Sequence, residues 1–366
     1  MNNSTSWSLF EPGVLFPPGY SSKDIPPNTP GALYPKPQDL LLIPVYGVAL
    51  VILRIIYERT IGKRLATQFF DIKVRKYAYK RNDYLESVYK QRKRPSEEEM
   101  SAIAKKLSWR QVEVINWFIR RRNSERPDLL TKFCEASWRF LFYTGSFTLG
   151  MSILLQAPWF YDTLNCWADN YPYQIMWKSV YYYYMLEGGF YFSLLLTLLR
   201  DVRRKDFLEM VIHHFATLFL IFFSYIANFL RLGTLVMAIH DISDIILELA
   251  KCFLYKGHKV ADDIFTAFAI TFIVSRIFVY PYMILYTSVV KSLWVFEPYF
   301  GYYFLNGMLV ILQILHLFWA HTIISMAIRM ARVGKVEKDA RSDAAEESID
   351  EGDGKPIKDE SKPHAE

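Results

Sequence analysis

Two polar clusters interrupt apolar stretches of the chain. His213 and His214 are adjacent in one stretch, and Asp241 and Asp244 lie three residues apart in the next. Because ionisable groups are unfavourable inside a membrane, such clusters are candidate functional sites. An imidazole accepts a proton from an amine or hydroxyl nucleophile, while a carboxylate bound to its other nitrogen orients the ring. An imidazole also takes up an acyl group and passes it on, so these residues predict acid–base or acyl-transfer chemistry.

The spacing along the chain predicts that the two clusters meet. His213 lies seven residues after Asp206, and Asp244 lies seven residues before Lys251. At about 1.5 Å of rise per residue, each group is about 10 Å inside the same end of its helix. If the two helices are antiparallel neighbours, the histidines and aspartates lie level. Two alternatives are open, namely polar contacts that only hold helices together and a mononuclear zinc site. The sequence favours catalysis without a metal.

Other ionisable residues in the apolar stretches have simpler interpretations. Glu187 and Arg276 are predicted to lie at matching depths and to pair with each other. His316 and His321, in the last apolar stretch, either line a cavity or pack inside the bundle. With seven histidines in all, the chain lacks the histidine boxes that membrane di-iron hydroxylases need.

The helices that carry these clusters belong to a chain of alternating apolar and charged blocks. The chain is 52% hydrophobic and 17% aromatic, and its 43 basic and 37 acidic residues are segregated between the apolar runs. Runs longer than about 18 residues cross roughly 30 Å of hydrocarbon as helices. This pattern excludes a soluble globular protein and predicts an all-α, polytopic membrane protein. About seven transmembrane helices are expected, at 39–57, 138–156, 174–199, 207–226, 232–252, 262–288 and 300–327.

Basic residues predict how the chain is oriented. They gather after the first, third, fifth and seventh apolar stretch, and the positive-inside rule assigns these segments to the cytosol. The Pro-rich tail at 1–38 is then lumenal, and N-glycan acceptor patterns begin at Asn2 and Asn3, one of which we expect to be glycosylated. We further expect a basic cytosolic segment at 58–131 and a disordered cytosolic tail at 328–366, which has too few apolar residues to fold.

The sequence between Arg203 and Tyr255 resembles the signature of the ceramide synthases, which are TLC-domain sphingoid-base N-acyltransferases. The matching elements are RRKDF, HHxxT, SYxxNxxRxGTLV and HDxSDxxLExAK. The resemblance implies that 132–327 forms a TLC domain, a bundle of six transmembrane helices around a lipid cavity, preceded by the helix at 39–57. It also implies a location in the endoplasmic reticulum membrane, and homodimers or heterodimers.

For the reaction, the resemblance implies transfer of a fatty acyl group from acyl-CoA, as co-substrate, to the amine of sphinganine or sphingosine. No bound cofactor or metal is implied. The family's functional pairs fall on His213 with His214 and on Asp241 with Asp244. The alternative function is that of a non-enzymatic TLC-domain protein that binds or senses lipid. Basic residues at the cytosolic helix ends are expected to bind the CoA phosphates, and these are Arg203, Arg204, Lys205 and Lys251.

The basic segment carries a second resemblance. Residues 109–127 resemble the recognition helix of a homeodomain, with the WFxxRR pattern from Trp117 to Arg122. A homeodomain reads adenine with an Asn at the position that Arg120 occupies here, so we do not expect sequence-specific DNA binding. We expect instead a basic helix that lies at the anionic cytosolic leaflet or guides the CoA phosphates.

Overall fold

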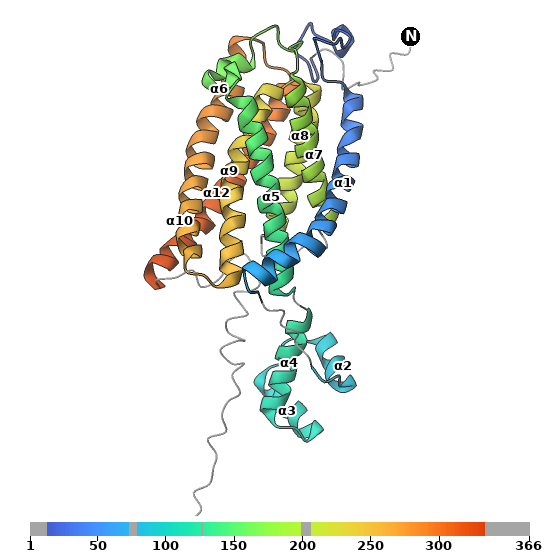
Figure 1. Cartoon of the computed structure of the whole chain (residues 1–366), viewed down its shortest axis with the longest axis vertical. Coiled ribbons are helices and arrows are strands. Elements are labelled where there is room, and N and C mark those ends of the chain that lie inside the picture. Colours follow the sequence, from blue (N-terminus) through green and yellow to red (C-terminus); the bar gives the residue numbers. More distant parts are fainter. Residues whose placement is uncertain (1–12, 73–78, 126, 199–205, 334–366) are drawn as a thin grey trace, which may run out of the picture.

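The computed structural model describes residues 13–72, 79–125, 127–198 and 206–333. Across these residues the chain is helical and has no β-strand, only two isolated bridges, which confirms the predicted all-α class. Long helices form an upright bundle, and the three short helices α2–α4 lie below it (Figure 1).

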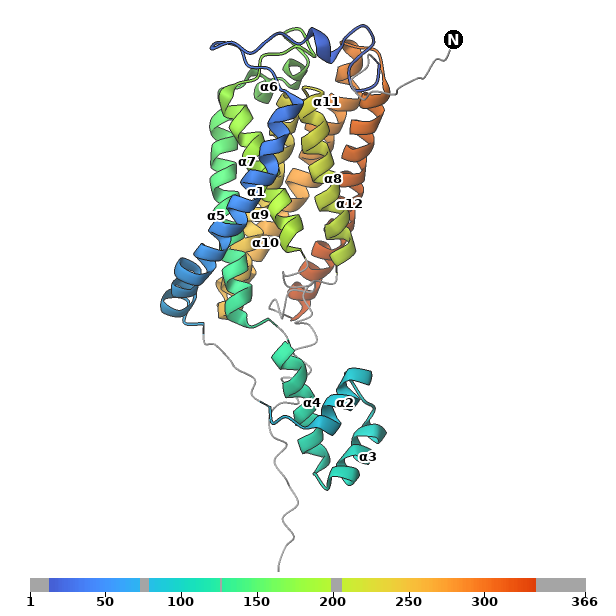
Figure 2. The same ribbon diagram turned by 90° about the vertical axis from the view of Figure 1, so that its right-hand side faces the viewer.

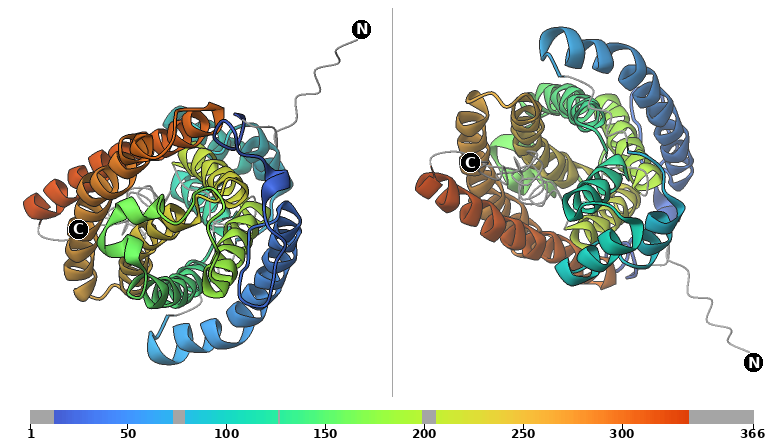
Figure 3. Two further views of the ribbon diagram at one scale, coloured as in Figure 1. Left: turned by 90° about the horizontal axis from the view of Figure 1, so that it is seen from above. Right: turned by 90° about the horizontal axis from the view of Figure 1, so that it is seen from below.

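The long helices of the bundle pack side by side. α5 packs against α9, α1 against α7, and α10 against α9. Figure 3 looks along the bundle and shows α1 on its outside, next to α7. π-helical segments continue α1 (Glu58–Gly62 and Leu65–Phe69) and α10 (Ile273–Leu285, η6). The bounds are α1 Leu42–Tyr57, α5 Leu129–Leu154, α7 Lys178–Thr197, α8 Phe207–Ile226, α9 Leu230–Lys256, α10 Val260–Phe272 and α12 Phe300–Val333.

Short elements connect the long helices. The three helices below the bundle are α2 (Asp83–Gln91), α3 (Glu97–Leu107) and α4 (Gln111–Glu125). The remaining elements are short turns of helix at the opposite end of the bundle: Ser22–Asp24, Pro37–Leu41, α6 Pro158–Tyr161, Thr163–Cys166, α11 Tyr286–Val289 and Lys291–Trp294.

Four stretches of the described residues are long and apolar enough to cross a membrane, which makes the chain a multi-pass membrane protein. Outward side chains of α1 such as Ile52 and Leu53 are each 53% exposed, as expected for a surface that faces lipid. α5, α7 and α9 are of similar length but more polar, so the count of seven crossings stays a prediction. The four stretches are Pro37–Phe69, Phe207–Ile226, Val260–Trp294 and Phe300–Arg332.

Several helices extend beyond the apolar stretches from which they were predicted. α5 begins at Leu129 instead of 138, and α12 continues to Val333, into the segment expected to be a tail. In the added turns of α5, Glu135 pairs with Arg139 at 3.6 Å and with Arg54 of α1 at 3.5 Å. Because these ion pairs compensate the charge of Glu135, the helix can include this residue inside the bundle. A hydropathy pattern does not account for such pairing, so it predicts a later start for α5.

A tight turn between α8 and α9 makes these two helices antiparallel neighbours. Asn228 adopts the left-handed conformation in this turn, with φ of 53°. Its side-chain amide donates to the carbonyls of Pro172 at 2.7 Å and Gln174 at 2.9 Å, which ties the turn to the loop before α7. The turn therefore fixes the register in which the polar groups of α8 and α9 face each other.

The α2–α4 unit lies beyond one end of the bundle (Figure 2). It has its own core. The Asn82 side chain accepts hydrogen bonds from the backbone of Tyr84 and Leu85 and so caps α2. Ser96 and Glu99 form a capping box at the start of α3. The buried apolar side chains that form this core are Leu85, Tyr89, Ile103, Ala104, Val114, Trp117 and Phe118.

Candidate active site

A polar cavity opens inside the bundle, with a volume of about 120 Å³. Leu198 at the end of α7 and Phe207 at the start of α8 line it, so it lies towards the end of the bundle that carries α2–α4. Both predicted histidines and one of the two predicted aspartates face it. Its charged and titratable lining is Arg139, Tyr143, Tyr191, His213, His214, Asp244, Glu248 and Arg276.

Aromatic rings hold His213 in the wall of this cavity. The indole of Trp319 from α12 meets the imidazole edge-on, with ring centroids 5.4 Å apart and planes at 85°. Trp319 is itself anchored, because its indole N–H donates to the Asp206 carboxylate at 3.1 Å. Tyr191 of α7 packs edge-on from another side at 6.2 Å. His213 is 7% exposed, and its Nδ1 atom has no hydrogen-bond partner among the described residues.

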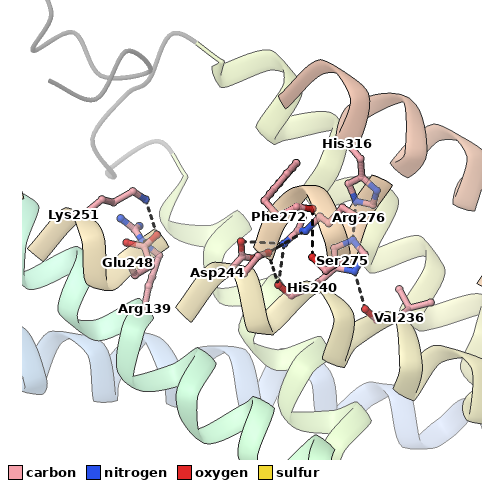
Figure 4. A network of polar contacts seen from close by, with 11 residues as sticks. Arg139, Val236, His240, Asp244, Glu248, Lys251, Phe272, Ser275, Arg276 and His316 are labelled. Atoms are coloured by element: carbon pink, nitrogen blue, oxygen red, sulfur yellow. Dashed lines mark hydrogen bonds and ion pairs between the residues drawn. The ribbon is translucent and has the colours of Figure 1, made fainter. Parts of the chain in front are cut away.

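Asp244 lines the same cavity, but its partner is Arg276 of η6. Arg276 donates to Asp244 at 3.0 Å, to the hydroxyl of Ser243 at 2.9 Å and to the backbone carbonyl of His240 at 2.9 Å (Figure 4). The expected pair between Arg276 and Glu187 is therefore wrong. Asp244 thus pairs with a guanidinium, and Nδ1 of His213, which a carboxylate was expected to orient, has no hydrogen-bond partner among the described residues.

Asp241 faces a different part of the bundle. It is 1% exposed, does not line the polar cavity, and lies next to Glu187 of α7 and Ser146 of α5. The Ser146 hydroxyl donates to Glu187. Neither carboxylate oxygen of Asp241 has a hydrogen-bond partner among the described residues. The structure thus brings His213, His214 and Asp244 together and places Asp241 on the side of α9 that contacts α5 and α7.

A second cavity, which we call the apolar cavity, lies next to the first on the side of the α8–α9 turn. Tyr191 lines both cavities, and His240 lies in the wall of the apolar one. The imidazoles of His240 and His213 are nearly parallel, with centroids 6.4 Å apart and planes at 21°. The apolar wall is made by Leu220, Ile221, Phe229, Leu232, Gly233, Val236, Met237, Leu305, Leu309 and Leu312.

Of the predicted phosphate-binding cations, Lys251 belongs to the described residues, and it does not line the polar cavity. Lys251 is 3% exposed and pairs with Glu248 at 2.7 Å, so it lies inside the bundle and not at a mouth. Arg139 of α5 does line the cavity, and its guanidinium lies 3.3 Å from the carboxylate of Glu248. The remaining predicted positions, Arg203, Arg204, Lys205, Asn2 and Asn3, lie outside the described residues.

Sequence reasoning missed three features of this region. It did not assign Trp319 or Arg139 to the cavity, because neither belongs to a polar cluster within an apolar stretch. It also missed that His316 forms a hydrogen bond with His240, whereas His321 is exposed. Within the described ranges, no group of three or more His, Cys, Asp and Glu side chains is placed to hold a metal ion.

Comparison with known proteins gives consistent matches over most of the chain. A family model described as the TLC domain matches residues 132–325, and one described as the homeodomain matches residues 76–127. Ceramide synthase 4 of Homo sapiens is 43% identical over 88% of this chain and 82% of that protein. Ceramide synthase 5 of Homo sapiens is 38% identical over 94% of this chain and 88% of that protein. Ceramide synthase hyl-1 of Caenorhabditis elegans is 30% identical over 83% of this chain and 77% of that protein.

Proposed function

The chain belongs to the ceramide synthase family of TLC-domain membrane proteins, and on that premise we propose that it transfers a fatty acyl group from acyl-CoA to the amine of a sphingoid base. The product is dihydroceramide from sphinganine and ceramide from sphingosine. The observation that carries the assignment of the site is the position of His213, in a polar cavity that shares the Tyr191 side chain with a neighbouring apolar cavity.

The two cavities suit the two halves of an acyl thioester. A fatty chain is stabilised by apolar walls, and the leucines of α8, α9 and α12 supply them. The thioester carbonyl then lies near the Tyr191 side chain that both cavities share, within reach of His213. The CoA headgroup stays at the end of the polar cavity that Leu198 and Phe207 line, and Arg203, Arg204 and Lys205 follow α7 in sequence.

Two chemical routes through His213 fit this arrangement. In one, the imidazole takes a proton from the sphingoid amine as it attacks the thioester carbon, and the C–S bond breaks. In the other, the imidazole attacks first and holds the acyl group until the amine displaces it. In both routes Asp244 holds the Arg276 guanidinium in place by an ion pair. The guanidinium then lies beside the reacting carbonyl, with its charge balanced by the carboxylate.

The topology of the chain follows from its basic residues. We place the α2–α4 end of the bundle in the cytosol and the opposite end, with the N-terminal tail, in the lumen of the endoplasmic reticulum. Glycosylation at Asn2 or Asn3 fits this orientation. A role in sphingolipid biosynthesis and assembly as homodimers or heterodimers accompany the family membership. With Arg120 in α4, we expect no sequence-specific DNA binding.

The proposed function is tested by incubating the purified protein with sphinganine and acyl-CoAs of graded chain length, with products identified by mass spectrometry. We expect dihydroceramide and free CoA in equal amounts. Protein that binds acyl-CoA but forms no product contradicts the proposal and supports a lipid-binding role. Intact-protein mass spectrometry after acyl-CoA is added without sphinganine separates the routes, since only the covalent one adds an acyl mass.

A further inference from the structure

The apolar cavity has two ends that differ in their surroundings. Its lining residues from α9 run from Leu232 to His240, so the cavity follows the helix for about 12 Å at about 1.5 Å of rise per residue. His240 marks the end next to the polar cavity, because its imidazole lies parallel to that of His213. Leu232 marks the other end, which lies at the α8–α9 turn and which we call the turn end. An acyl chain with its carbonyl near His213 therefore points its tail towards the turn end.

Phe229 lies at the turn end of this cavity. It belongs to the turn between α8 and α9, lines the apolar cavity and is 3% exposed. Its backbone N–H donates to the carbonyl of Ser224 at 2.8 Å, and its carbonyl accepts from the N–H of Gly233 at 2.9 Å. Moving this residue away from the cavity would break hydrogen bonds to both helices, so the backbone holds the ring at a fixed place.

Two aromatic side chains support the Phe229 ring from outside the cavity. Trp167 meets it edge-on, with centroids 4.8 Å apart and planes at 74°, and Tyr171 meets it at 5.7 Å and 82°. Neither of them lines the apolar cavity, and they are 1% and 5% exposed. The Trp167 indole N–H donates to the Thr287 carbonyl at 3.1 Å, and the Tyr171 hydroxyl donates to the Ala227 carbonyl at 3.1 Å. The ring is thus backed by anchored side chains and has no free space into which to retreat.

The other residues of the cavity wall come from helices that run along it. Leu220 and Ile221 belong to α8, and the leucines from Leu305 to Leu312 belong to α12. Of the described residues that line the cavity, Phe229 is the one that lies between helices and not within one. The helices therefore form the side walls, and Phe229 forms an end wall.

An end wall and a side wall act differently on acyl chains of different length. Burial of each further CH₂ group stabilises a bound fatty chain. This gain stops at a fixed end wall, because protein interiors are densely packed and extra CH₂ groups force neighbouring side chains out of their preferred rotamers. Chains of every length pass the side walls, whereas only the longest chains that fit reach the end wall. The end wall therefore limits chain length, and the side walls contribute to the binding of every chain.

On the basis of the proposed acyl transfer, we propose that Phe229 determines the longest acyl chain that the protein transfers. The methyl end of the chain stops against the Phe229 ring, while the thioester carbonyl lies at the other end of the cavity, near Tyr191 and His213. Acyl-CoAs with a longer chain leave their carbonyl short of His213 and react more slowly. Because Trp167 and Tyr171 support the ring, the limit is set by the rigid turn and not by a mobile side chain.

The test is the chain-length preference of Phe229→Ala, measured with sphinganine and a series of acyl-CoAs in steps of two carbons. The quantity compared is the rate for the chain two carbons longer than the wild-type optimum, divided by the rate for that optimum. Removal of the ring lengthens the cavity, so this ratio should rise by about threefold to about fifteenfold, the upper value being the effect of burying two more CH₂ groups. Phe229→Leu removes fewer atoms and should raise the ratio by a smaller factor.

Leu220→Ala is the matched control, because Leu220 lines the same cavity as part of a side wall. It should lower both rates and keep the ratio at the wild-type value. An unchanged ratio in folded Phe229→Ala overturns the proposal, and so does an equal rise in Leu220→Ala. If Phe229→Ala does not fold, an unchanged ratio in Phe229→Leu has the same meaning. Wild-type protein that forms no dihydroceramide from any acyl-CoA contradicts the proposed function instead, so the two failures are distinguishable.

Discussion

The α2–α4 unit and the cavity region of the bundle differ in the groups that they leave buried without a hydrogen bond. In the unit, Arg121 is matched by Glu86 at 2.7 Å and by Glu125 at 3.0 Å. In the bundle, Nδ1 of His213 and both carboxylate oxygens of Asp241 are buried without a hydrogen-bond partner among the described residues. Buried polar atoms without partners destabilise a fold. In the bundle one of them, Nδ1 of His213, belongs to a side chain that lines the polar cavity. Asn123 Oδ1 in α4 is also buried without a partner among the described residues, so burial alone does not separate the two regions. The polar cavity around His213 is what places the proposed chemistry in the bundle.

The largest effect on stability is expected from breaking the charge pair between Arg276 and Asp244 in the cavity region. Arg276→Met leaves the Asp244 carboxylate uncompensated and should lower the free energy of unfolding by about 3 to 5 kcal/mol. Asp244→Asn added to this variant should recover a large part of the loss. Glu187→Gln is the matched control and should recover none. Thermal unfolding in detergent measures all three, and recovery by Glu187→Gln would show that the pairing is misassigned.

A smaller effect, on specificity, is expected from the apolar cavity. A Cβ atom added at Gly233 would lie 1.7 Å from the Tyr184 hydroxyl, so Gly233→Ala must displace a ring that lines this cavity. The cavity becomes shorter, and the ratio of rates for long and short acyl-CoAs should fall several-fold. Gly307→Ala on α12, where an added Cβ meets nothing within 4 Å, should keep the wild-type ratio. Equal chain preference in both variants would contradict the placement of the acyl chain.

The smallest effect on the reaction is expected from the α2–α4 unit. Arg121→Ala removes two ion pairs and a contact with the rings of Tyr79 and Tyr89, and should destabilise the unit by about 1 to 3 kcal/mol. N-acylation should stay at the wild-type level. Hydrogen exchange over residues 83–125 reports the local loss, and Arg110→Ala, at a side chain that is 71% exposed, is the control. A collapse of activity in Arg121→Ala alone would give the unit a part in the reaction.

The sequence was sufficient to predict the class of fold and the contact between α8 and α9. Apolar stretches with basic residues on alternate sides predict a helical membrane protein, and the short connection before Leu230 predicts antiparallel neighbours. The depth argument therefore placed His213 level with Asp244, and both line one cavity.

The sequence was not sufficient for the partners of these groups. Depth along a helix follows from residue number, whereas the direction of a side chain depends on how each helix is rotated in the bundle. Without knowledge of how each helix is rotated, the sequence does not show that Arg276 forms its ion pair with Asp244 and not with Glu187. The burial of Lys251 depends in the same way on the position of Glu248. Asp241 and Asp244 are three residues apart, so their side chains do not point in quite the same direction from α9. Asp241 lies beside Glu187 and Ser146, whereas Asp244 pairs with Arg276.

The most direct test of the account is the rate of sphinganine N-acylation by His213→Ala, compared with His321→Ala. Both variants remove an imidazole from a helix of the bundle, but only His213 lines the polar cavity. We predict that His213→Ala lowers the rate by about 10²-fold to 10⁴-fold or more, while His321→Ala keeps it. Wild-type turnover by a folded His213→Ala protein would contradict the central claim that acyl transfer takes place at this imidazole.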